Sequence, residues 1–213
     1  MDIHKIVITL VVLGISVIVH EVAHGYIAYR LGDPTAKIAG RLTLNPTPHI
    51  DPVGTILFPV ICLVLNFSFF FAWAKPVPVN PTYFKNPKKD DILVAIAGPG
   101  SNLILALIFT LGFAFIPASI INSYPGIELL LQTGIQWNVL LAVFNMLPIP
   151  PLDGAHVLKN SLPDEIGDKF GMLWPYGFFI LIGLLYVGVL GKVMLPIMAV
   201  IYTGLNQVIS ILA

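Results

Sequence analysis

Long apolar runs separated by short polar connections make up most of this chain. A helix needs about 20 mostly apolar residues to cross a bilayer, because it rises about 1.5 Å per residue. Five runs meet that length, at 5–29, 92–116, 127–148, 171–190 and 192–212. The pattern therefore predicts an all-α polytopic membrane protein with five to six membrane helices, folded as a single domain over residues 1–213.

A sixth apolar run, 54–73, is long enough to cross the membrane but is interrupted by a proline and an asparagine. We expect it to be re-entrant, or to lie only partly in the membrane. The flanking connections, 30–52 and 74–91, are rich in proline, which ends helices. Within these connections, 41–44 and 73–79 are expected to form short extended or edge-strand segments.

The composition supports a membrane protein. Of the 213 residues, 57% are hydrophobic and 10% are charged, and the mean hydropathy is +0.90. A soluble domain carries about 25% charged residues, so the composition excludes a soluble globular enzyme and a disordered chain. The formal net charge is zero, which leaves no field to attract nucleic acid. We therefore expect a multi-pass protein of the cell membrane whose main partner is the lipid bilayer.

The first apolar run contains the pattern H-E-x-x-H at His20, Glu21 and His24. Positions i and i+4 share one face of a helix, so both imidazoles can bind one Zn²⁺ ion. Glu21 lies beside that face, where it can take a proton from the attacking water instead of binding the metal. A charged residue inside a membrane helix costs about 2.5–3.5 kcal/mol on insertion scales, which disfavours a lipid-facing position. The alternative is a polar contact between helices without a metal.

A catalytic zinc usually has three protein ligands, so one more side chain is needed. Asp153 stands out among the candidates because it follows the run 127–148 after a segment with three prolines, which forces the helix to unwind. Unwound backbone at membrane depth is tolerated where it lines a cavity. A plain turn aspartate in an Asp-Gly pair is the alternative. The other candidates are His4, His49, His156 and the remaining acidic residues.

A shared metal also restricts the topology. The two histidines lie near the end of the first span and Asp153 lies just beyond 127–148, so an even number of crossings must separate them. The run 54–73 therefore should not cross. Connections 30–52, 74–91 and 149–170 then lie on one side, which the positive-inside rule makes cytoplasmic. These connections contain nine of the 11 basic residues: Arg30, Lys37, Arg41, Lys75, Lys85, Lys88, Lys89, Lys159 and Lys169.

Three motifs together resemble the site-2 protease family, whose members are zinc metalloproteases that cleave transmembrane substrates inside the bilayer. The motifs are His20–His24 followed by Gly25, Ala97-Gly98-Pro99-x-x-Asn102, and Asn145-x-x-Pro148-x-x-x-Leu152-Asp153-Gly154. The resemblance covers roughly residues 5–160 and is to a minimal form without PDZ-type or CBS-type domains. It implies that His20, His24 and Asp153 bind zinc, that Glu21 is the general base, and that Asn145 lines the active site.

Several further residues have two interpretations each. Asn145 and Asn102 are candidate donors to the developing oxyanion, or they form amide hydrogen bonds between helices. His156 stands close to a position where relatives often have Arg. His49 and Asp51 either support the metal face or fix their loop, or they are plain loop residues. The run Lys88–Asp91 is expected to be a solvated helix start facing the headgroups.

The sequence thus predicts a zinc-dependent intramembrane endopeptidase with a transmembrane protein as its substrate. A substrate helix must unwind before cleavage, and the stretch 73–81 is a candidate edge that holds it extended, with Val77 and Val79 offering pockets. A plain extended loop is the alternative. Two other functions are alternatives. One is a metal transporter or sensor that uses the same ligands, but transporters usually show related halves, which are not evident here. A non-catalytic scaffold derived from a protease is disfavoured by the intact His, Glu, His and Asp set.

Overall fold

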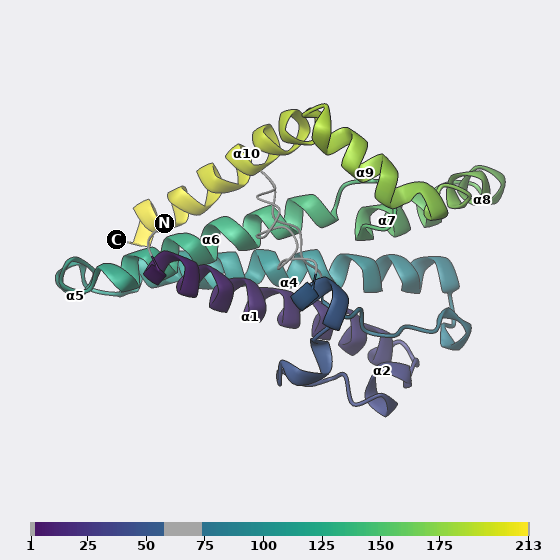
Figure 1. Cartoon of the computed structure of the whole chain (residues 1–213), viewed down its shortest axis with the longest axis horizontal. Coiled ribbons are helices and arrows are strands. Elements are labelled where there is room, and N and C mark those ends of the chain that lie inside the picture. Colours follow the sequence, from purple (N-terminus) through teal and green to yellow (C-terminus); the bar gives the residue numbers. More distant parts are fainter. Residues whose placement is uncertain (1–2, 58–73, 213) are drawn as a thin grey trace.

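Three long helices form the centre of the protein. The computed structural model describes residues 3–57 and 74–212, and every regular element in those ranges is helical. Helices α1 (Ile3–Arg30), α4 (Pro87–Phe115) and α6 (Pro125–Asn145) each pack against the other two. α4 runs opposite to α1 and α6 (Figure 1). Five helical stretches are long and apolar enough to cross a membrane, as predicted, and the fourth of them is Asp164–Tyr186.

Shorter elements lie at the two ends of this bundle. α5 (Ala118–Ser123) joins α4 to α6 at one end (Figure 1). At the other end lie α2 (Thr35–Ile38), α7 (Asp153–Ser161) and α8 (Asp164–Gly171). The connections between the helices also contain single turns at Thr47–His49, Pro52–Leu57, Pro81–Tyr83 and Trp174–Tyr176. Because α1 ends and α4 begins at this second end, the long connection between them starts and finishes at one end of the bundle (Figure 1).

The last two apolar helices follow each other in one direction. α9 (Gly177–Tyr186) and α10 (Val189–Leu212) together run antiparallel to α6, so the N and C termini lie at the same end (Figure 1). Contacts agree, since Leu181 belongs to the same buried cluster as Leu147, just after α6, and the Tyr202 hydroxyl donates to the Gln136 carbonyl at 3.5 Å. The predicted run 171–190 corresponds to the helical stretch Asp164–Tyr186, which includes a turn with Pro175. The ten residues of α9 alone extend about 15 Å, so this stretch reaches membrane length only together with the residues before α9.

The two faces of α1 carry different types of side chain. Val7, Leu10, Val11 and Ile15 are each more than half exposed, and a helix of this length with such a face is suited to contact with lipid chains. The buried face carries smaller or polar residues, namely Val12, Ser16, His20, Gly25 and Ala28. The first histidine of the motif is therefore turned into the bundle and away from lipid.

α4 begins five residues before its predicted start. Pro87 occupies the first turn, where its missing N–H is harmless, and the Asp90 carboxylate accepts the Asn86 N–H at 2.9 Å. Asp90 is only 7% exposed, and Asp91 contacts the side chain of His156. The expectation of a solvated run at Lys88–Asp91 is thus wrong for both aspartates, because one caps α4 and the other packs between helices.

The expected edge strands do not form regular strands in the described residues. Segment 74–80 is non-helical, and its backbone is bound by neighbouring groups. The Lys75 N–H donates to the His49 carbonyl at 2.9 Å, and the Asn80 N–H donates to Asp33 Oδ2 at 2.6 Å. Its prolines lack the N–H groups that a regular ladder needs. The re-entrant segment predicted at 54–73 lies mostly outside the described residues, which resume at 74.

The structure confirms one of the roles considered for His49, which is to fix its loop. Its side chain is buried, and its Nε2 atom donates to the Thr43 carbonyl at 2.9 Å. Its own carbonyl accepts the Lys75 N–H. His49 therefore fixes the loop 43–49 to segment 74–80.

Candidate metal centre

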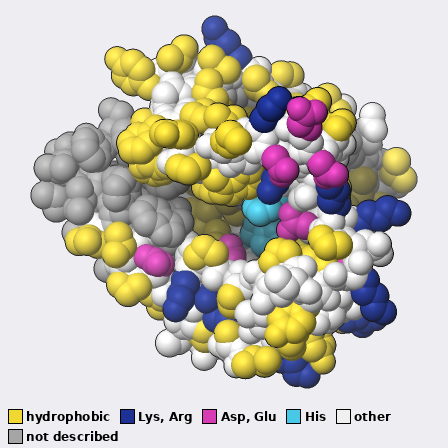
Figure 2. Space-filling model, turned by 90° about the vertical axis from the view of Figure 1, so that its right-hand side faces the viewer, with side chains coloured by type: hydrophobic (Ala, Val, Ile, Leu, Met, Phe, Trp, Pro, Cys, Tyr) yellow, Lys and Arg dark blue, Asp and Glu magenta, His cyan; other side chains and the backbone are white. Residues whose placement is uncertain are grey.

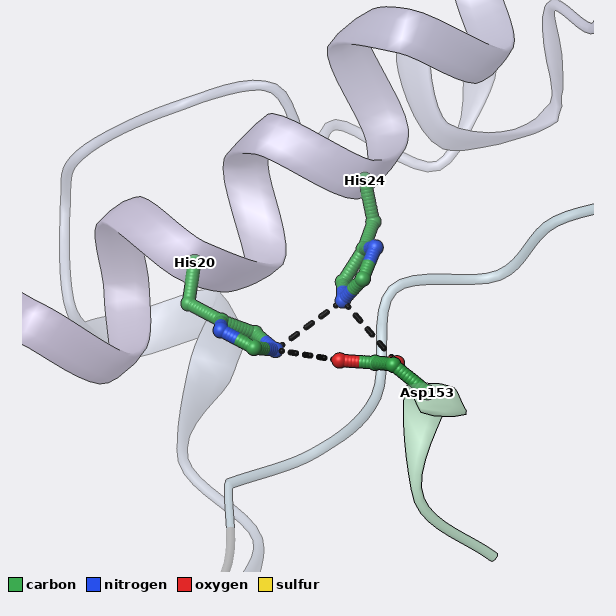
Figure 3. A group of neighbouring side chains, drawn as sticks. All are labelled: His20, His24 and Asp153. Atoms are coloured by element: carbon green, nitrogen blue, oxygen red, sulfur yellow. Dashed lines mark hydrogen bonds and ion pairs between the residues drawn. The ribbon is translucent and has the colours of Figure 1, made fainter. Parts of the chain in front are cut away.

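Three predicted ligands meet at one point inside the bundle (Figure 3). His20 and His24 project from the same face of α1, and Asp153 projects toward them from the first residue of α7. His20 Nε2 lies 3.2 Å from Asp153 Oδ2, and His24 Nε2 lies 3.4 Å from Asp153 Oδ1. The two Nε2 atoms are 3.0 Å apart. All three side chains thus aim their ligand atoms at a common space.

Asp153 reaches this space because the chain unwinds before it, as the prolines predicted. α6 ends at Asn145, residues 146–152 form turns, and α7 starts at Asp153. Gly154 lets the start of α7 pack tightly against this turn, since a Cβ there would collide with the Met146 carbonyl. The unwound segment therefore delivers a carboxylate that a continuous helix would carry past the site.

Both histidines are oriented by hydrogen bonds from their second ring nitrogen. His20 Nδ1 donates to Asn102 Oδ1 at 2.7 Å, and His24 Nδ1 donates to the Val94 carbonyl at 2.7 Å. Because both partners are oxygen acceptors, the proton resides on Nδ1 and the Nε2 lone pair is left for a metal. The centre therefore presents two imidazoles whose Nδ1 atoms are engaged and whose Nε2 atoms face the site, as zinc binding requires.

Asn102 belongs to a buried chain of amides. Its Nδ2 atom donates to the Ser16 carbonyl at 3.3 Å and to Asn138 Oδ1 at 3.0 Å, and Asn138 donates to the Gly134 carbonyl at 2.8 Å. Asn102 and Asn138 are both fully buried. Of the two interpretations of Asn102, the structure shows interhelical amide bonding, which leaves no N–H for an oxyanion. Asn138 was missed, although an amide within an apolar helix is a usable signal.

Asn145, the other candidate oxyanion donor, is bonded within its own helix. Its Nδ2 atom donates to the Leu141 carbonyl at 3.0 Å. Within the described ranges no hydrogen bond joins it to His20, His24 or Asp153. Its catalytic role stays a prediction that rests on the family resemblance.

Glu21 stands beside the three ligands and is not one of them. Its Oε2 atom accepts the Val77 N–H at 2.7 Å. Val77 is 7% exposed and belongs to segment 74–80, the predicted substrate edge. The carboxylate is therefore held next to the centre by the segment on which a peptide was predicted to lie.

The site fits a divalent metal ion. Asp153 Oδ2 is buried and has no hydrogen-bond partner among the described residues, only the ion-pair contact with His20. A cation placed between the two Nε2 atoms and the carboxylate would compensate this buried oxygen. Two imidazoles and one carboxylate form a donor set typical of catalytic zinc.

Gly98 keeps space open at this centre. A Cβ on Gly98 would lie 2.6 Å from both Cε1 and Nε2 of His20 and would also collide with His24 Nε2. We expect Gly98→Ala to weaken zinc affinity by about 10- to 100-fold, as disturbed outer-shell packing does. Chelator competition measures the affinity. Gly100→Ala is the matched control, since a Cβ there meets no described atom within 4 Å, and equal affinities in both variants would contradict the expectation.

Two histidines and an aspartate form a cluster among membrane-length helices, and a glutamate lies beside it. This arrangement defines a membrane-embedded metalloprotein of the zinc-peptidase type. Comparison with known families gives the same result from the whole sequence. The family described as Peptidase family M50 matches residues 8–126 and 120–184. The chain belongs to this family, the site-2 protease family of zinc metalloproteases, and is an integral membrane protein.

Individual relatives cover most of the chain. It is 43% identical over 194 residues to the Bacillus subtilis (strain 168) protein named "Putative zinc metalloprotease YwhC", covering 89% of this chain and 83% of that protein. It is 32% identical over 191 residues to "Putative zinc metalloprotease Rip2" of Mycolicibacterium smegmatis, covering 87% and 70%. It is 34% identical over 154 residues to "Putative zinc metalloprotease MJ0611" of Methanocaldococcus jannaschii, covering 72% and 70%. No solved structure gave a significant match.

Proposed function

We propose that this protein is a zinc-dependent endopeptidase of the cell membrane that hydrolyses peptide bonds of transmembrane substrate proteins within the bilayer. The convergence of His20, His24 and Asp153 beside Glu21 carries the proposal. The two histidines lie six and ten residues before the end of α1, which is about 9 to 15 Å inside that end of the helix. A bond cleaved there would lie at membrane depth.

The geometry assigns a task to each residue. His20, His24 and Asp153 would hold Zn²⁺ through two Nε2 atoms and one carboxylate. When bound, zinc polarises the peptide carbonyl and lowers the pKa of water. The water oxygen bonds to the carbonyl carbon, the C–N bond breaks, and Glu21 carries a proton from the water to the leaving amine. Asn102 and Val94 hold the imidazoles in the required tautomer.

We place the site near the cytoplasmic face. The nine basic residues predicted to share one side all belong to segments at the end where α1 finishes and α4 and α7 start (Figure 1). Figure 2 looks onto this end and shows basic and acidic side chains around a central histidine. Basic residues flanking membrane helices concentrate on the cytoplasmic side. This distribution supports cleavage close to that surface.

Segment 74–80 remains our candidate for holding the substrate extended. Pro76 and Pro78 remove two N–H groups, so one edge of the segment offers carbonyl acceptors to a peptide backbone. The double change Val77→Ala and Val79→Ala should lower turnover about 10- to 100-fold, because a small displacement of the peptide is costly, and zinc content should not fall. Cleavage of a model transmembrane peptide measures this. Ile38→Ala, which changes an exposed side chain nearby, is the control. Undiminished turnover in the valine variant would show that segment 74–80 does not hold the substrate.

The proposed activity is tested in cells through its products. Membrane-protein fragments are compared by proteomics between cells with the natural protein and cells with Glu21→Gln. Fragments that arise from cuts inside membrane spans are expected only with the natural protein, with intact precursors accumulating in the variant. Identical fragment sets would oppose the proposal.

A further inference from the structure

One face of α4 contacts both histidines of the candidate metal centre. Asn102 binds His20, the Val94 carbonyl binds His24, and Gly98 packs against both rings. These three residues are spaced by four, so they form one stripe along α4. Asp91 lies three residues before Val94, at the end of the same stripe. The stripe therefore continues from the histidines of α1 toward the helix that carries Asp153.

Asp91 binds that helix, α7, through two side chains. Its Oδ2 atom lies 3.1 Å from His156 Nδ1 and accepts Asn160 Nδ2 at 2.5 Å. Asn160 also donates to the His156 carbonyl at 2.9 Å, which ties the two partners together. On its other side, the His156 ring meets the edge of Trp174, with ring centroids 5.1 Å apart. His156 is thus held between α4 and the turn that follows α8.

The position of His156 on α7 connects this cluster to the metal centre. Asp153 and His156 are three residues apart, so they lie on neighbouring positions of one helix face. α7 is a nine-residue helix that packs mainly on α4 and α8. A contact one turn beyond Asp153 therefore fixes both the rotation of α7 about its axis and its position along that axis, relative to α4.

We propose that Asp91 and His156 are a positioning pair that fixes α7 on α4 and thereby places Asp153 within reach of the two imidazoles. The inference rests on the proposed function, because it concerns the same metal centre. Within the described residues, no hydrogen bond or ion pair joins either member of the pair to His20, His24 or Asp153. The pair acts on the metal only through the two helices.

This pair differs from an ordinary surface ion pair at the same end. The Lys88–Asp164 pair also starts from α4, but its side chains are 48% and 83% exposed, and it leads to α8. Exposed pairs of this kind contribute little. The Asp91 side chain is only 19% exposed and accepts a hydrogen bond from Asn160 in addition to its contact with His156. Lys88–Asp164 is therefore a natural control.

The test measures metal binding by the full-length protein in detergent, without reference to catalysis. Zinc affinity is determined by chelator competition, and Co²⁺ substitution gives an absorption spectrum that reports ligand geometry. Asp91→Asn and His156→Ala should each lower zinc affinity about tenfold, the lower end for outer-shell partners, and should change the Co²⁺ spectrum. His156→Arg should restore both, because a guanidinium can reach Asp91. Asp164→Asn should leave both unchanged.

The pair also predicts non-additivity. The double variant Asp91→Asn with His156→Ala should lose no more affinity than Asp91→Asn alone, since the Asp91–His156 contact is already lost in that single variant. The inference would be overturned by unchanged zinc affinity in both single variants. It would also be overturned by additive losses in the double variant, or by an equal loss in Asp164→Asn. His156 is half-exposed, so its variants remain informative if Asp91→Asn does not fold. Failure of the natural protein itself to bind zinc would instead oppose the proposed function.

Discussion

Replacing Glu21 with Gln is expected to abolish peptide hydrolysis while zinc remains bound. Glutamine has nearly the same shape, and its carbonyl oxygen can still accept the Val77 N–H that holds Glu21. It cannot take a proton from water, so the general-base contribution of about 10²–10⁴ in rate is lost. Cleavage of a model transmembrane peptide by purified protein measures the rate, and elemental analysis measures the zinc.

Glu128→Gln is the matched control for this substitution. Glu128 lies in the first turn of α6, at the end of the bundle away from the metal centre, and bonds Gln132. Its variant should cleave at the natural rate. Zinc lost from Glu21→Gln would make Glu21 a ligand, and hydrolysis retained by that variant would require another base. A transporter that used the same ligands would keep transporting metal in Glu21→Gln, which separates the two functions.

The candidate metal centre was predictable because the chemistry of its residues conflicts with their surroundings. His20, Glu21 and His24 interrupt an apolar helix, where ionisable groups are retained for a purpose. The prolines before Asp153 predicted the unwound turn that brings it inward. The requirement that one ion contact both segments then implied two crossings between them. α4 and α6 supply those crossings in the structure.

The partners that orient the ligands were harder to predict. The acceptor for His24 is the backbone carbonyl of Val94, and any residue type supplies a carbonyl. Asn138 meets Asn102 only when α4 and α6 pack in one particular register. Asp91 looked like part of a solvated charge run, because its partner His156 lies 65 residues further along the chain. Such pairs depend on tertiary packing, which local pattern does not encode.

The hydropathy pattern also did not predict the direction in which the last two helices run. Apolar composition records that a segment suits a membrane but carries no direction. The interruption at Pro175 was visible in the sequence. Gly188 adopts a φ of +76°, which ends α9 and lets α10 continue away from the site end. Whether such a joint reverses the chain or only bends it depends on packing against α6.

Asp153→Ala is expected to remove zinc binding and proteolysis together. The substitution leaves two imidazoles, and two protein ligands do not form a catalytic zinc site. Affinity should fall by more than about 100-fold, the upper limit seen for outer-shell partners, because a ligand itself is lost. Asp153→Asn should behave similarly, since the amide keeps the shape but loses the negative charge that would bind the metal ion. Chelator competition and peptide cleavage are the two measurements.

Asp168→Ala removes a carboxylate from the exposed surface of α8 at the same end of the protein and should change neither measurement. Asp153 has the decisive position because it joins two parts of the chain that the sequence separates by more than a hundred residues. Its buried Oδ2 has no hydrogen bond to compensate its desolvation, which is tolerable if a cation approaches it. Undiminished zinc in Asp153→Ala would mean that the metal binds elsewhere, and the assignment of Glu21 as the base would fall with it.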